Sequence, residues 1–80
     1  MKTIVETSTG VSVYMFNDDG APEITEENVI FDGDVVDIQL NSTNASIVEN
    51  ISPPDDWIGR KYILNNGEWS QNPNDPTLTQ

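Results

Sequence analysis

Two dipeptides, Asp32-Gly33 and Asn66-Gly67, each stand between two short runs in which apolar and polar residues alternate. A two-residue type I′ turn requires positive φ at both central residues, and Asn, Asp and Gly adopt that conformation most readily. We therefore predict two β-hairpins centred on these dipeptides. Because side chains alternate between the two faces of a strand, each hairpin also predicts which residues share a face.

The first hairpin places Phe31 opposite Asp34 and Val29 opposite Val36. One face of the hairpin is then apolar along its whole length, and we expect this face in the core. A slip of one residue would mix the two faces, which favours this register. The core residues predicted from this hairpin are Val29, Phe31, Val36, Ile38 and Leu40.

The opposite face of the first hairpin is polar except for Ile30 and Val35. A chain of 80 residues without disulfides leaves sheet edges that it cannot easily cover. We therefore expect a second copy of the chain, or another protein, to cover Ile30 and Val35. The sequence predicts a homo-oligomer with these two residues in the interface.

The second hairpin places Leu64 opposite Trp69, with Tyr62 on the same face. Trp57 precedes the hairpin and is expected to cover this cluster. A Trp or Tyr side chain buries roughly 150–250 Å², so a few of them can supply much of a small core. We predict that Trp57, Tyr62, Leu64 and Trp69 are structural core residues.

The apolar composition indicates an all-β protein. Ile and Val together number 15, whereas Leu, Met and Ala together number 7, and β-branched residues favour strands. We expect one domain, residues 1–72, with about six to eight short antiparallel strands in a small sandwich or partly open barrel. Residues 73–80 are polar and interrupted by proline, so we predict a flexible C-terminal tail.

The chain is strongly acidic, with a formal net charge of −11 from 14 acidic residues against Lys2, Arg60 and Lys61. Such a chain cannot bind nucleic acid by neutralising phosphates, so we expect no direct nucleic-acid partner. Eight of the acids lie between residues 18 and 37 with no cation among them. Carboxylates on one strand face stand about 6.5–7 Å apart and could imitate a row of DNA phosphates. An acidic inhibitor of a DNA-binding protein is therefore an alternative function.

The sequence contains no His and no Cys, so the commonest general base and the thiol nucleophile are absent. We expect no catalytic residue, no enzyme activity and no cofactor. Oxygen ligands for Ca²⁺ occur at Asp32, Asp34 and Asp37, and again at residues 17–19, but neither spacing follows an EF-hand loop. We predict no metal site, and a sugar- or Ca²⁺-binding module remains a minor alternative.

The N-terminal residues, M-K-T-I-V-E-T-S, contain no basic region followed by a long apolar stretch. No segment approaches the roughly 18 apolar residues of a membrane-spanning helix. The sequence therefore predicts a soluble cytoplasmic protein with no membrane partner.

Two segments of the chain are similar to segments of a known group of proteins. They are P-P-D-D-W-I-G-R-K-Y-I-L-N-N-G-E-W-S-Q-N-P and the opening M-K-T-I-V-E-T-S-T-G-V-S-V-Y. The chain resembles small uncharacterised proteins of tailed bacteriophages of marine and cyanobacterial hosts, in which D-W-x-G-x-K-Y leads into a G-x-W hairpin ending in N-P. Residues 17–50 share only the character of short strands. The resemblance implies a phage structural or accessory protein that acts through protein–protein contacts in the cytoplasm of the infected host or in the virion. It implies no catalytic residues.

Overall fold

The computed structural model describes residues 1–74, which form eight short strands and no helix. The all-β prediction of six to eight short antiparallel strands is confirmed. The strands are β1 (Lys2–Glu6), β2 (Ser12–Phe16), β3 (Glu23–Ile24), β4 (Val29–Phe31), β5 (Asp34–Asp37), β6 (Ala45–Val48), β7 (Tyr62–Asn65) and β8 (Glu68–Gln71).

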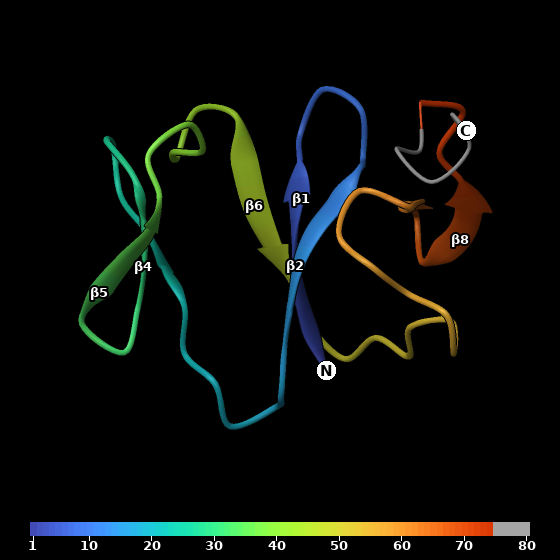
Figure 1. Cartoon of the computed structure of the whole chain (residues 1–80), viewed down its shortest axis with the longest axis horizontal. Coiled ribbons are helices and arrows are strands. Elements are labelled where there is room, and N and C mark those ends of the chain that lie inside the picture. Colours follow the sequence, from blue (N-terminus) through green and yellow to red (C-terminus); the bar gives the residue numbers. More distant parts are fainter. Residues whose placement is uncertain (75–80) are drawn as a thin grey trace.

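The strands form three small sheets. The central sheet has the order β2-β1-β6, the outer sheet has the order β3-β4-β5, and the C-terminal hairpin consists of β7 and β8. Figure 1 shows the central sheet in the middle, with β4 and β5 on one side of it and β8 on the other. Most of the predicted tail lies outside the described residues. Residues 1–74 contain no helix that is long and apolar enough to cross a membrane.

β1 is the middle strand of the central sheet and pairs with β2 on one side and β6 on the other. Its three inner residues, Thr3, Ile4 and Val5, are buried, and Ile4 is fully buried. A β-bulge in the pairing of β1 with β2 leaves Val13 unpaired, and Val13 also turns into the core. The main cluster of buried apolar residues comprises Ile4, Val11, Val13, Val29, Leu40 and Ala45.

The outer sheet contains the first predicted hairpin. Asp32 (φ 55°) and Gly33 (φ 80°) form its turn, and positive φ at both positions is the type I′ conformation. The predicted pairing of Phe31 with Asp34 is present next to the turn. The local sequence therefore determines the turn and the first pair of this hairpin.

A β-bulge changes the register of the same hairpin beyond its first two pairs. Val29 pairs with Asp37 rather than with Val36, which is left unpaired. One inserted residue moves the following side chains to the other face of the strand. The prediction that Val36 and Ile38 are core residues is therefore wrong, because Val36 is 40% and Ile38 78% exposed. Val29 and Leu40 are buried.

The C-terminal hairpin has the second predicted turn, with φ of 52° at Asn66 and 81° at Gly67. Leu64 pairs with Trp69, in the register that a two-residue turn specifies. The two strands remain in register along their whole length. In contrast to the outer sheet, no bulge interrupts this hairpin.

The C-terminal hairpin joins the central sheet beside β2. Val11 forms an isolated bridge with Ile63, and the N–H of Leu64 donates to the Gly10 carbonyl at 2.9 Å. Gly10 has φ of 79°, and a Cβ atom there would lie 3.0 Å from the Leu64 carbonyl oxygen. The close approach of the two backbones therefore requires glycine at this position.

The other predicted core residues lie at different depths. Leu64 is buried, whereas Phe31, Trp57, Tyr62 and Trp69 are only partly buried. The core cluster is formed mainly by Ile and Val, and the aromatic residues that pack against it are Tyr14 and Phe16.

Candidate functional site

The acidic residues considered as calcium ligands lie in exposed turns and in contacts within the chain. Within residues 1–74, no three side chains of Asp, Glu, His or Cys converge in a way that could hold a metal ion. Asp32 and Asp34 are exposed at the hairpin turn, while Asp37 accepts hydrogen bonds from the chain itself. The second group, residues 17–19, is an exposed turn closed by the N–H of Gly20.

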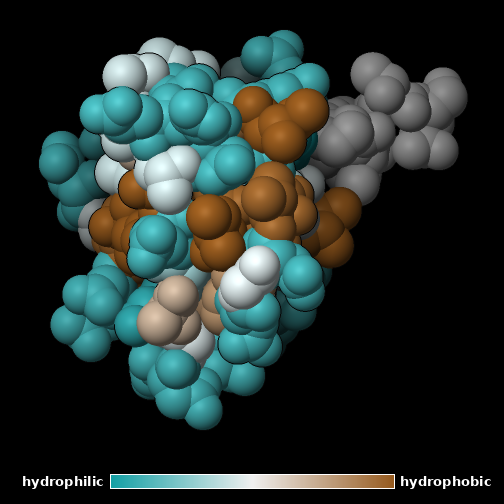
Figure 2. Space-filling view, turned by 90° about the vertical axis from the view of Figure 1, so that its left-hand side faces the viewer, coloured by the Kyte–Doolittle hydropathy of each residue, from teal (hydrophilic) through white to brown (hydrophobic). Residues whose placement is uncertain are grey.

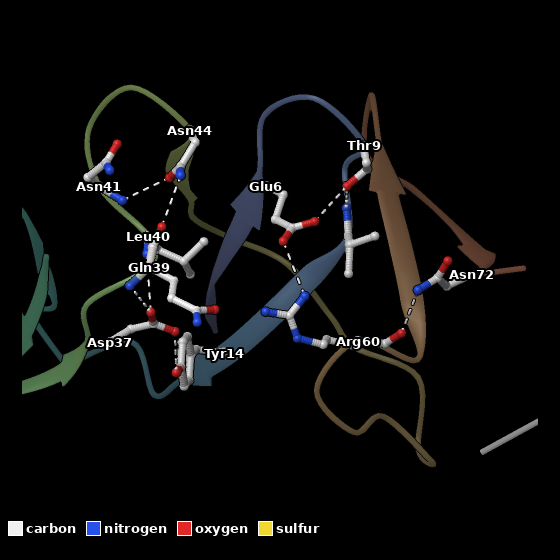
Figure 3. A network of polar contacts seen from close by, with 11 residues as sticks. Glu6, Thr9, Tyr14, Asp37, Gln39, Leu40, Asn41, Asn44, Arg60 and Asn72 are labelled. Atoms are coloured by element: carbon white, nitrogen blue, oxygen red, sulfur yellow. Dashed lines mark hydrogen bonds and ion pairs between the residues drawn. The ribbon is translucent and has the colours of Figure 1, made fainter. Parts of the chain in front are cut away.

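One carboxylate joins the outer sheet to the central sheet. Asp37 Oδ2 accepts a hydrogen bond from the Tyr14 hydroxyl at 2.7 Å, which links β5 to β2 (Figure 3). Asp37 Oδ1 accepts from the N–H of Gln39 at 2.7 Å and from the N–H of Leu40 at 3.1 Å. These bonds turn the chain after β5 and direct Leu40 into the core. We call this arrangement the Tyr14–Asp37 clamp.

The clamp shifts the pKa values of both side chains. Burial alone raises the pKa of Asp37, but the hydrogen bonds from Tyr14, Gln39 and Leu40 favour the charged form and leave the pKa below its ordinary value. The hydrogen bond to Asp37 raises the pKa of Tyr14, and burial and the negative charge add to this effect. At neutral pH the clamp therefore consists of an ionised Asp37 and a protonated Tyr14.

A buried chain of hydrogen bonds crosses the central sheet. Trp57 Nε1 donates to Ser12 Oγ at 3.0 Å, and the Thr3 hydroxyl donates to the Tyr14 carbonyl at 2.7 Å. The hydroxyls of Ser12 and Thr3 also contact each other. Because the Thr3 hydrogen goes to Tyr14, the Ser12 hydroxyl must donate to Thr3. Each of these side-chain polar groups has a partner, and the hydrogen bond from Trp57 to Ser12 attaches Trp57 to β2.

The aromatic residues of the C-terminal hairpin are likewise tied to the chain. The rings of Tyr62 and Trp69 meet edge to face, with centroids 6.3 Å apart. Trp69 Nε1 donates to the Ser52 carbonyl at 3.0 Å, and the Tyr62 hydroxyl donates to Asp56 Oδ1 at 2.6 Å. These contacts attach the hairpin to the segment that precedes it. Their evident role is architectural, which weakens the sugar-binding alternative.

A second polar network surrounds Glu6 and Arg60 (Figure 3). Arg60 Nη1 lies 3.1 Å from Glu6 Oε2, and the Thr9 hydroxyl donates to Glu6 Oε1 at 3.0 Å. The N–H of Arg60 donates to the Ser12 carbonyl, and its carbonyl accepts from Asn72 Nδ2, both at 2.8 Å. These contacts hold Arg60 at φ 71°, a conformation that residues other than glycine rarely adopt.

Two shallow hollows adjoin this ion pair, with volumes of about 340 Å³ and about 250 Å³. The larger one includes the apolar side chains of Val11 and Ile63, and both include Glu6 and Arg60. The side chains of Arg60 and Glu6 are 45% and 26% exposed, and each neutralises the other's charge. The network therefore offers a ligand little charge, and it serves to fix the segment around Arg60 to the central sheet.

β5 is an edge strand of the outer sheet and carries an exposed apolar surface. Val35 is 53%, Val36 40% and Ile38 78% exposed, and Ile30 pairs with Val35 and is partly exposed. We call these four residues the β5 surface. Figure 2 shows the side of the molecule on which the outer sheet lies, where apolar side chains gather in a band between hydrophilic regions. Exposed apolar groups beside an open strand edge are typical of contact surfaces.

Acidic residues stand at both ends of strand β5, and the second of them, Asp37, lies between Val36 and Ile38 of the β5 surface. Asp34 begins β5 and is exposed, and Asp37 ends the strand. Between residues 23 and 37, which span the outer sheet and its turns, all 6 ionisable residues are acidic. The β5 surface is therefore an apolar surface set in a negative field.

Comparison with known proteins does not add to this description: no protein-family model matches the chain, and no curated protein or solved structure matches it.

The structure brings Ile30 and Val35, the residues predicted for an interface, into one pair of the outer sheet. Sequence reasoning assigned Ile38 to the core and not to the interface, although it is the most exposed of the five large apolar residues exposed within residues 1–74. Its alternation with Val36 indicated a buried face, and no local signal revealed the bulge.

Proposed function

We propose that this protein is a small, non-enzymatic structural or accessory protein that acts through protein–protein contacts. The contact uses the β5 surface, and its occupant is a second copy of the chain or another protein of the same assembly. The resemblance of both ends of the sequence to proteins of tailed bacteriophages supports a role in phage assembly or in the infected host cell. The proposal assigns no catalytic residue and no cofactor.

The exposure of Val35, Val36 and Ile38 is the observation that carries this proposal. These three residues occur within four positions of the chain, at an open sheet edge. Covering them would remove three β-branched side chains from water, and burial of apolar area is the main favourable term in association. The Tyr14–Asp37 clamp fixes this edge against the central sheet, so the surface is organised before a partner binds.

Two measurements test the proposed contact. Light scattering over a dilution series should give a mass above that of one chain if a second copy is the occupant, and Val35→Glu should lower that mass. Ile58→Glu is the matched control, because Ile58 is 43% exposed but lies outside the β5 surface. For another occupant, a photo-crosslinking side chain at position 35 should form crosslinks in the native cell that the same group at position 58 does not form. A monomer at all concentrations without crosslinks specific to position 35 would contradict the proposal.

A second candidate function is an acidic inhibitor that imitates DNA, and the exposure of the acids favours it. Asp18, Asp19, Glu26, Glu27 and Asp32 are all exposed, and no cation lies among them in the sequence. Such an inhibitor binds through charge and does not need the apolar β5 surface. Competition with duplex DNA for a DNA-binding protein, unaffected by Val35→Ser, would favour this second function over the first.

A further inference from the structure

We propose that the partner of the β5 surface is a different, basic protein, which adds an extended segment to the edge of β5 with apolar residues in its centre and Lys or Arg at its ends. This inference rests on the proposed function and specifies the partner. Its basis is the combination of an open strand edge, an apolar centre and acidic ends at one place in the structure.

The open edge of β5 explains why an extended segment fits. Paired residues in an antiparallel ladder alternate between hydrogen-bonded and non-hydrogen-bonded pairs, so part of the β5 backbone is directed away from β4. These groups form a template for another strand. An added strand makes main-chain hydrogen bonds with the edge, and its alternate side chains contact the apolar residues of the surface. Val35 and Val36 stand in the centre of β5, where such side chains would lie.

The charges of β5 disfavour a second copy at the same edge. In the antiparallel arrangement that matches Val35 with Val36, each Asp34 would lie opposite Asp37 of the other copy. Like charges directly opposite each other destabilise a strand pair, and opposite charges stabilise it. The field of the other acids in residues 23–37 adds to the repulsion between two copies.

The chain also lacks a basic segment that could serve another copy as the complementary partner. Lys2, Arg60 and Lys61 are its only Lys and Arg residues. Each of them forms an ion pair with an acid of the same chain, at 3.4, 3.1 and 2.9 Å. A different protein with Lys or Arg free of such pairs is therefore better suited to place a positive charge at both ends of β5.

Binding of short peptides to the full chain provides the test. The probe is a capped Lys-Val-Ile-Val-Lys peptide, measured by calorimetry or by fluorescence anisotropy with a labelled peptide. The first control peptide, Glu-Val-Ile-Val-Glu, reverses the charges, and the second, Lys-Gly-Ser-Gly-Lys, keeps them but removes the apolar centre. A third control methylates the backbone nitrogens of the probe and removes its capacity to add as a strand. We expect each of the three to bind at least about tenfold more weakly than the probe.

Substitutions in the protein locate the binding. Val35→Ser and Ile38→Ser should each weaken binding of the probe severalfold, whereas Ile58→Ser, at a 43% exposed site outside the β5 surface, should not. Asp34→Asn should weaken it more than Asp55→Asn, which removes the same charge from an exposed position in the segment between β6 and β7. Added salt should weaken binding of the probe, because it screens the attraction between the Lys residues of the probe and the acids of the protein.

The outcomes separate this inference from the proposed function. If the chain self-associates and Val35→Ser abolishes the association while the probe does not bind, the contact surface is right and the basic partner is wrong. If the probe and Lys-Gly-Ser-Gly-Lys bind equally, charge alone is responsible, and the inference is overturned in favour of the DNA-imitating inhibitor. If the chain neither binds the probe nor depends on Val35 or Ile38 in any association, the contact surface itself is wrong.

Discussion

The central sheet and the outer sheet each consist of three short antiparallel strands rich in Ile and Val, yet they bury these residues very differently. In β1, Ile4 is 0% and Val5 is 6% exposed, whereas in β5, Val35 is 53% and Val36 is 40% exposed. The residue types are the same, so composition does not determine the difference. What differs is coverage: other parts of the chain pack over the central sheet but leave the edge of the outer sheet open.

The charges of the two sheets differ as well. The central sheet and its surroundings contain the chain's cations in ion pairs, with Lys2 in β1 and Arg60 held against Glu6. The outer sheet and its turns contain only acids among their ionisable residues. The central sheet and Val29 of β4 therefore form the folding core, while the open edge at β5 has the features of a contact surface. Matched substitutions in the two sheets test this difference.

The largest difference in the free energy of unfolding is expected when an Ile is replaced by Ala in the central sheet and beside β5. Ile4→Ala should lower the free energy of unfolding by about 2–5 kcal/mol, because it leaves a cavity beside the middle strand of the central sheet. Ile38→Ala should change it by no more than about 0.5 kcal/mol, because Ile38 is 78% exposed. Urea denaturation of the two variants provides the measurement. Equal losses in both variants would show that the outer surface contributes to the core.

The buried hydrogen-bond chain should give the next largest effect. Ser12→Ala leaves Trp57 Nε1 without an acceptor and Thr3 without its donor, so it should lower the free energy of unfolding by about 1–3 kcal/mol. Ser46→Ala makes the same change at an exposed position of β6 in the same sheet, and it should be nearly neutral. Thermal unfolding followed by circular dichroism compares the two variants. A similar melting temperature for both would mean that the chain of hydroxyls contributes nothing to stability.

The Tyr14–Asp37 clamp links the two sheets, and Tyr14→Phe should lower the free energy of unfolding by about 1 kcal/mol. The pKa of Asp37 is lowered on folding, so its contribution is present above its ordinary pKa of 3.8 and is lost as the pH falls through the lowered value. The pKa of Tyr14 is raised above 10.0, so its contribution is present below that pH and is lost as the pH rises through the raised value.

Measuring the free energy of unfolding from pH 2 to 7 tests the contribution of Asp37. Asp37→Asn should lose less stability than the wild type as the pH falls, because it lacks the carboxylate that becomes protonated. An unchanged profile in Asp37→Asn would show that other carboxylates are responsible for the loss of stability at low pH.

The smallest effect is expected from salt. The acids between residues 18 and 37 have no Lys or Arg among them in the sequence and repel one another, so added NaCl at pH 7 should raise the melting temperature modestly by screening them. Asp32→Asn should reduce this rise, because Asp32 is an exposed member of the group. A melting temperature that falls with salt would instead indicate that the ion pairs of Lys2, Arg60 and Lys61 outweigh the repulsion.

The sequence predicted the parts of the fold that depend on neighbouring residues. Positive φ at Asp32-Gly33 and Asn66-Gly67 follows from the residue types, and it determines the pairs Phe31–Asp34 and Leu64–Trp69. The predicted pairing of Val29 with Val36 is wrong, because the alternation of apolar and polar residues in the sequence does not reveal the bulge at Val36. With the bulge, Asp37 stands opposite Val29 and bonds Tyr14, a partner 23 positions away.

Less of the candidate site could be predicted. Val35 was identified because it interrupts a polar face, and this pattern is visible in the sequence. Ile38 was missed because its exposure depends on the bulge, and Ser12 was missed because its partner Trp57 is distant in sequence. Contacts between residues far apart in the chain require the tertiary structure, and they decide which apolar residues are covered.

We propose that this protein binds its partner at the β5 surface rather than at the hollows around Arg60. Titration of the isotope-labelled protein with the Lys-Val-Ile-Val-Lys peptide, followed by amide chemical shifts, tests it most directly. We predict that the largest shifts occur between residues 30 and 38, and that they are reduced in Val35→Ser. Shifts concentrated at Glu6, Thr9 and Arg60, or no shifts at millimolar peptide, would contradict the claim.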